Sequence, residues 1–107
     1  MKIINKVGDT GYIQWVEQFV GQIVQESKID CEEVIIEDIE HSRRIFLTID
    51  GQEYAIRTWS FHSIEKDEQN QTCAEMVDYT LFRTVADDTG SHGEEICNGL
   101  LKIEWKN

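Results

Sequence analysis

Cysteine and histidine have the right atoms to bind zinc, and a cysteine beside a histidine could act as a nucleophile in this 107-residue sequence. Three of each occur: Cys31, Cys73, Cys97, His41, His62 and His92. No two of them stand at the short spacing of a zinc site, and isolated cysteines are more often plain buried thiols. A catalytic pair such as Cys73 with His62 would require proximity and a lowered thiol pKa, which spacing does not indicate. We therefore expect no metal and no catalytic cysteine.

Other catalytic and cofactor chemistry also lacks a motif. The glycines form neither of the phosphate-binding patterns, and the segment DDTGSHGEE lacks the ligand order of a calcium loop. With 21 carboxylates in the chain, chance pairs are expected, so no general acid–base dyad stands out. The expectation is a protein that is not an enzyme and that uses no cofactor.

Charge is the most informative property of the composition. Twenty-one acidic residues against ten basic ones give a net charge of −11 at pH 7. Nucleic acids and anionic membranes are poor ligands for such a chain, because both are bound by basic surfaces. A basic protein partner is the natural complement. The first residues lack the apolar core of a secretory signal and the thiols form no regular pairs, so we expect a cytoplasmic protein.

The acids are concentrated in three segments. Seven lie within residues 26–40, and seven more lie in two polar segments around residues 65–68 and 87–95. If folding brings these segments to one side, they form a surface that attracts a cationic protein, with nearby aromatic side chains as apolar anchors. The predicted partner-binding residues are Glu32, Glu33, Glu37, Asp38, Glu40, Trp59, Phe61, Asp67, Glu68, Asp87, Asp88, Glu94 and Glu95.

The elements that must position these side chains follow from hydrophobic periodicity. Residues 12–28 carry an apolar stripe of helical spacing, made of Tyr12, Val16, Phe19, Val20, Ile23 and Val24. Strands are predicted at 2–7, 33–40, 45–59, 73–85 and 99–105, and polar loops at 60–72 and 86–95. This order predicts a single α+β domain over 1–107, with an N-terminal helix packed on a four- to five-stranded, mostly antiparallel meander.

Asp50-Gly51 is the strongest local signal, because it predicts a type I′ turn at the tip of the 45–59 hairpin. The turn sets the register, with Leu47 opposite Tyr54 and Ile45 opposite Ile56 on the buried face. On the other face Phe46 stands opposite Ala55 and Arg44 opposite Arg57. Two arginines directly across a hairpin repel each other, so we expect Glu37 or Glu40 on the preceding strand to neutralise them. A bound anion is the alternative.

In size, acidity, lack of catalytic motif and helix-plus-meander layout, the chain resembles immunity proteins of bacterial contact-dependent inhibition and related polymorphic toxin systems. The resemblance covers the whole chain and rests on no shared motif, so it assigns no residue roles. It implies a small cytoplasmic inhibitor that neutralises a basic toxin domain, often a nuclease. Two alternatives are a nucleic-acid mimic that inhibits a DNA- or RNA-binding host protein, and a ligand-binding or enzymatic domain with a pocket between helix and sheet.

Overall fold

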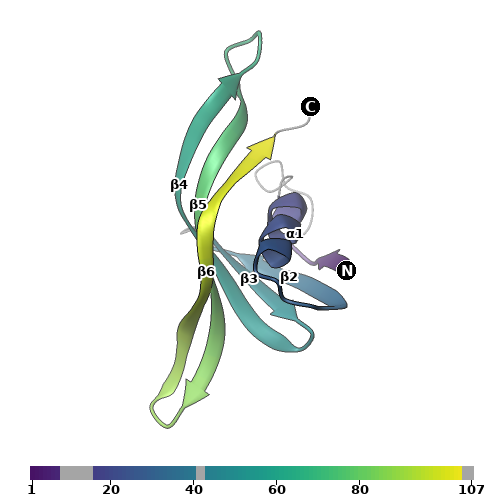
Figure 1. Ribbon diagram of the computed structural model, residues 1–107, viewed down its shortest axis with the longest axis vertical. Helices are drawn as coiled ribbons and strands as arrows, with labels where there is room; N and C mark the ends of the chain where they lie inside the picture. The colour runs from purple at the N-terminus through teal and green to yellow at the C-terminus, as the bar shows by residue number, and fades with distance from the viewer. Residues whose placement is uncertain (8–15, 41–42, 105–107) are drawn as a thin grey trace.

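The computed structural model describes residues 1–7, 16–40 and 43–104, and within these ranges the chain forms one helix and a six-stranded sheet (Figure 1). Strands that follow one another in sequence are neighbours in the sheet. All neighbouring pairs are antiparallel except β1 and β2, whose parallel pairing requires the crossover that contains α1. The elements are β1 (Lys2–Asn5), α1 (Val16–Glu26), β2 (Glu33–Ile39), β3 (Arg44–Ile49), β4 (Gln52–Lys66), β5 (Thr72–Asp87) and β6 (Gly90–Glu104).

The predicted fold class is wrong in the number of strands, in the type of sheet and in the share of helix. The sheet has six strands and is mixed, because β1 pairs with β2 in parallel, and strands make up most of the described chain. The two segments predicted as polar loops, 60–72 and 86–95, are mostly strand. Their side chains are largely exposed, so they lack the apolar alternation by which a half-buried strand is recognised.

The core lies between α1 and one face of the sheet, which we call the inner face. The helical stripe packs there through Val16, Phe19, Val20, Ile23 and Val24, all buried as predicted. Tyr12, the remaining predicted member of the stripe, lies outside the described residues. The helix ends at Glu26, two residues before the predicted end at 28, and the predicted residues 12–15 lie outside the described ranges.

The predicted hairpin is confirmed in every pair of its register, from Ile49 opposite Gln52 to Arg44 opposite Arg57. Its turn residues have the left-handed backbone of a type I′ turn, with φ of 46° at Asp50 and 85° at Gly51. Because side chains alternate along a strand, this register places Leu47 in the core and leaves Phe46 on the opposite face, which we call the outer face.

Tyr79 connects the end of the helix to the middle of the sheet. The Tyr79 hydroxyl donates a hydrogen bond of 2.8 Å to the Glu26 carboxylate, and the ring meets Phe19 edge-on at 6.0 Å. Gly99, directly opposite on β6, leaves room for this ring, because a Cβ there would lie 3.2 Å from the hydroxyl oxygen. Burial, followed by the hydrogen bond to Glu26, raises the pKa of Tyr79 well above its ordinary value.

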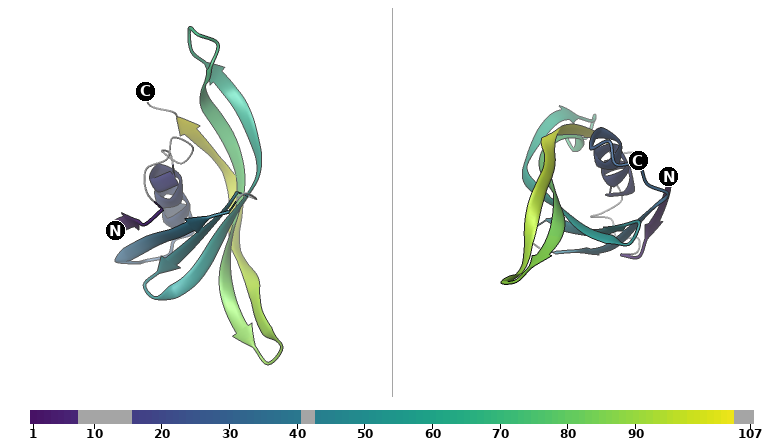
Figure 2. Two further views of the ribbon diagram at one scale, coloured as in Figure 1. Left: turned by 180° about the vertical axis from the view of Figure 1, so that it is seen from behind. Right: turned by 60° about the horizontal axis from the view of Figure 1, so that its bottom comes forward.

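The sheet is strongly twisted and curls around α1 (Figure 2). Register shifts interrupt the β2–β3, β4–β5 and β5–β6 pairings, and bulges of this kind bend a strand and increase its twist. The β4–β5 hairpin extends to one end of the molecule and the β5–β6 hairpin to the other, which gives dimensions of 54 × 26 × 24 Å (Figure 1). The long strands β4, β5 and β6 therefore determine where most of the surface residues lie.

Leu47→Ala should lower the free energy of unfolding by about 2–5 kcal/mol, because the side chain is 1% exposed and its loss leaves a cavity in the core. The shift in the urea midpoint measures the effect. Leu100→Ala is the matched control, since Leu100 is 57% exposed and should change stability little. Equal midpoint shifts for the two variants would contradict the assignment of the inner face.

Candidate binding face of the sheet

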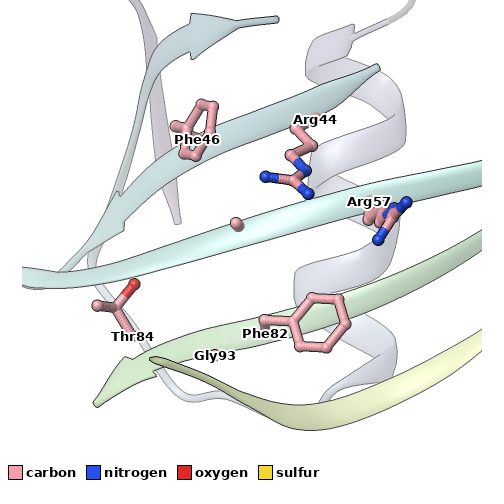
Figure 3. Close-up of a pocket in the computed structure, with 7 residues that line it drawn as sticks. Arg44, Phe46, Arg57, Phe82, Thr84 and Gly93 are labelled. Atoms are coloured by element: carbon pink, nitrogen blue, oxygen red, sulfur yellow. The ribbon is translucent and has the colours of Figure 1, made fainter. Parts of the chain in front are cut away.

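The outer face carries an open pocket of about 320 Å³, which we call the arginine pocket (Figure 3). Its two phenylalanines come from β3 and β5, and Figure 3 shows them on either side of β4 with the helix behind the sheet. The pocket thus lies on the face opposite to the helix, not between helix and sheet as the ligand-binding alternative supposes. The lining residues are Arg44, Phe46, Ala55, Arg57, Phe82, Thr84 and Gly93.

Two small residues make this face hollow. Ala55 stands in register with both Phe46 and Phe82, so a methyl group separates two aromatic rings on adjacent strands. Gly93 lies against Phe82, where a Cβ would approach the Phe82 Cβ to 3.3 Å and the ring to 3.4 Å. An aromatic side chain covering a strand glycine is a stable arrangement, and it holds Phe82 in place as a wall of the pocket.

The two arginines are not neutralised as the sequence predicts. Glu37 instead accepts a hydrogen bond of 3.0 Å from the Thr48 hydroxyl. Glu40 lies beside Arg44, with its N–H bonded to the Arg44 carbonyl, yet no described carboxylate forms an ion pair with Arg44 or Arg57 within 4 Å. Among the described residues, neither guanidinium group therefore has a carboxylate within ion-pair distance.

A neighbouring indole holds the second arginine in position. The Arg57 guanidinium stacks over the Trp59 ring, 4.0 Å from its centre, and Trp59 Nε1 donates a 2.9 Å hydrogen bond to the Thr80 hydroxyl. The stack is a cation–π contact that occupies the face of the guanidinium. A guanidinium donates its hydrogen bonds at the edge, so this stack does not use them.

A bulge in β2 concentrates carboxylates on the same outer face. Glu37 is the extra residue between the Ile36–Leu47 and Asp38–Phe46 pairs, so Glu37 and Asp38 both point outward, and Glu40 follows opposite Arg44. All three side chains are exposed. We call Glu37, Asp38 and Glu40 the acidic strip.

The other predicted acids do not join this strip. Asp67 and Glu68 lie at the β4–β5 turn, whereas Asp87 and Asp88 lie at the β5–β6 turn, at the far end of the 16-residue strand β5. A strand of that length separates its ends by about 50 Å. The three acidic segments therefore do not converge on one surface.

Several of these acids have internal roles. Asp67 accepts hydrogen bonds from the N–H groups of Gln69 and Gln71, and Asp87 accepts from the hydroxyl and N–H of Thr89. These hydrogen bonds, with a contribution from His92, lower the pKa of Asp87. Glu94 pairs with Arg83 at 3.2 Å. These three acids are explained by turns and local pairing. Within the described ranges, no ion pair to a basic side chain is found for Glu32, Glu33, Asp38, Glu68, Asp88 or Glu95.

The two predicted aromatic anchors lie on opposite faces. Trp59 is on the outer face and is 53% exposed. Phe61, beyond the bulge in β4, pairs with the buried Val77 and packs against the core beneath the Arg43 guanidinium, 4.3 Å from its ring centre. A single partner surface therefore cannot use both rings.

Cys31, Cys73 and Cys97 are free, and burial raises the pKa of Cys31 and Cys97, which disfavours the thiolate. In the described part of the chain, no three His, Cys, Asp or Glu side chains form a group that could hold a metal ion. No helix in those ranges has the length and apolar character needed to cross a bilayer.

Comparisons with known proteins leave this surface as the main guide to function. No protein-family model, no curated protein and no solved structure matches the chain. Four of the seven pocket residues could be placed from the sequence alone. The Asp50-Gly51 turn already puts Arg44, Phe46, Ala55 and Arg57 on one face. Phe82, Thr84 and Gly93 were missed, because the register of β5 and β6 depends on long strands that the sequence does not reveal.

Arg44→Gln should make the protein more stable than Arg83→Gln by roughly 0.5–1 kcal/mol at low salt. The first change relieves repulsion with Arg57, whereas the second breaks the pair with Glu94. Both remove one positive charge from a chain of net charge −11, so the change in overall repulsion cancels in the comparison. Urea unfolding at low and high salt measures the difference, which should shrink with salt. A less stable Arg44→Gln variant would mean that Arg44 has a stabilising partner.

Proposed function

We propose that this chain is a non-enzymatic inhibitor that binds a basic protein domain through the outer face of its sheet. The observation that carries the proposal is the bulge at Glu37, which turns three carboxylates of one strand to the same side. Ordinary alternation would divide them between the two faces. The acidic strip is thus a local concentration of negative charge on a face that the described helix does not cover.

The same face offers side chains that can hold a partner after charge has attracted it. Trp59 and Leu100 are 53% and 57% exposed, and both stand on the outer face, since Leu100 pairs with Asp78 and Trp59 bonds to Thr80. Tryptophan is one of the residues most often found at the energetic centre of protein interfaces. An aromatic centre beside a charged rim is the usual anatomy of such a surface.

Charge supports a basic partner and a mechanism without chemistry. A negative surface speeds the encounter with a positive one, and close contacts then determine how long the complex lasts. A nuclease domain is one such partner, because it presents Lys and Arg to bind phosphates. With the resemblance to immunity proteins, this favours inhibition of a toxin domain in the cytoplasm. A nucleic-acid mimic is favoured less, since Arg44 and Arg57 interrupt any continuous row of carboxylates on this face.

Reversing the acidic strip by Glu37→Lys, Asp38→Lys and Glu40→Lys should weaken partner binding by about tenfold or more while leaving the fold intact. The partner is first isolated by affinity capture from an extract of the source organism, and its binding is then measured by calorimetric titration. Glu17→Lys, Glu68→Lys and Asp88→Lys form the control, because they change net charge equally on exposed sites elsewhere. Unchanged affinity in the strip variant, or equal losses in both, would exclude the strip as the contact.

Association of the wild-type protein with that partner should slow steeply as salt rises from about 0.01 M to about 0.15 M. The reason is that salt shortens the range over which the acidic strip attracts a basic domain. Stopped-flow measurement of the association rate tests this, with the strip variant as comparison. A rate independent of salt would indicate an apolar interface instead.

A further inference from the structure

We propose that the arginine pocket is a separate binding site for a small planar molecule that carries a carboxylate or phosphate group. The inference goes beyond the proposed function, because the acidic strip contributes no residue to the pocket lining. Of the seven residues around the cavity, two are arginines and none is acidic, in a chain with twice as many acids as bases. That reversal of charge is local and belongs to this cavity.

The arginine end of the pocket is suited to an anion. Arg44 and Arg57 are direct cross-strand partners, so their side chains start about 5 Å apart and emerge on the same side. Like charges in such a pair are destabilising, and no described carboxylate pairs with either one. A bound carboxylate or phosphate relieves the repulsion and accepts hydrogen bonds from both planar guanidinium groups. Stacking on Trp59 already fixes the orientation of Arg57 at 4.0 Å.

The aromatic end of the pocket is suited to a flat group. Phe46 and Phe82 stand on β3 and β5 in one row with Ala55 between them, so their backbones are about 9.5 Å apart. A ring placed over Ala55 would lie about 5 Å from each phenylalanine, which is within the range of stacked aromatic pairs. Figure 3 shows the two rings flanking the cavity with both arginines toward one end. The volume of about 320 Å³ matches the lower range of small-molecule sites.

Carboxylates flank the row of Phe46, Ala55 and Phe82, so the anionic group of a ligand is favoured only at the arginine end of the pocket. Continuing the row outward, Asp38 lies beyond Phe46 on β2 and Glu95 lies beyond Phe82 on β6. The phenylalanines thus stand between these carboxylates and the cavity. The favoured ligand places its flat part in the phenylalanine row and its anionic group in the arginine row next to it.

The test titrates benzoate and phenyl phosphate into the ¹⁵N-labelled protein at physiological salt, where the net charge of the chain is screened. Acetate and inorganic phosphate serve as the corresponding anions without a ring. Both aromatic anions should shift the signals of Ala55, the Arg57 side chain and the Trp59 indole N–H, and acetate and phosphate should bind about tenfold more weakly. The tighter of the two aromatic anions tells whether the site takes a carboxylate or a phosphate.

Three variants locate the binding. Arg44→Gln with Arg57→Gln should weaken phenyl phosphate binding by about tenfold or more, and Ala55→Leu should do the same by filling the cleft while both arginines remain. Arg83→Gln is the matched control, because Arg83 directly follows Phe82 but points to the other face, where it pairs with Glu94. It should bind as the wild type does. Amide spectra and urea midpoints verify that each variant is folded.

Several results would overturn the proposal. These are no shift of pocket signals at about 10 mM ligand, equal binding of acetate and benzoate, or full binding by Ala55→Leu. Loss of partner binding in the pocket variants, without any binding of the small anions, would assign the pocket to a protein contact and also overturn it. The proposed function is tested separately by the acidic-strip variant, because its substitutions leave the pocket lining unchanged.

Discussion

A twisted sheet of six strands has two broad faces, and the described part of this chain supplies one helix to cover them. That helix buries its apolar stripe on the inner face, in one cluster with Leu47, Tyr79 and Leu81 of the sheet. The opposite face has to remain compatible with water while its strands keep their pairing. Its side chains therefore need not be apolar or closely packed, and the unusual features of the molecule lie on this face. The pocket, the exposed indole and the acidic strip all depend on this one-sided coverage.

Strand register is the means by which that free face acquires a shape. Alternation along a strand sends neighbours to opposite faces, so residues as close in sequence as Phe82 and Arg83 serve different surfaces. Bulges then change the rule locally. The bulge in β2 places Glu37 and Asp38 on one side, and the bulge in β4 separates Trp59 from Phe61. Ala55 and Gly93 add a hollow among larger side chains. The bulges and these two small residues thus account for the shape of the outer face.

The distribution of charge is more local than the net value suggests. Acids at the two hairpin turns are held about 50 Å apart by β5, and Asp67 and Asp87 there accept hydrogen bonds from backbone N–H groups of their own turns. Such acids are part of the turns. The acidic strip and the arginine pocket, in contrast, put opposite charges side by side on one face. A surface arranged in this way can attract a basic domain and still hold a small anion, because the two contacts use different residues.

Short-range patterns in the sequence determined the parts of the structure that local chemistry controls. The Asp50-Gly51 turn specified the β3–β4 register pair by pair, and the spacing of Val16, Phe19 and Val20 specified the buried side of the helix. The length of β4, β5 and β6, the parallel pairing of β1 and the bulges came only from the tertiary structure, since exposed polar strands carry no alternation and pairing joins residues far apart in sequence. For the same reason the sequence supplied Arg44 and Arg57 as a pair but not Phe82 and Gly93 as their neighbours. A pocket that spans four strands exists only when all of their registers are set together.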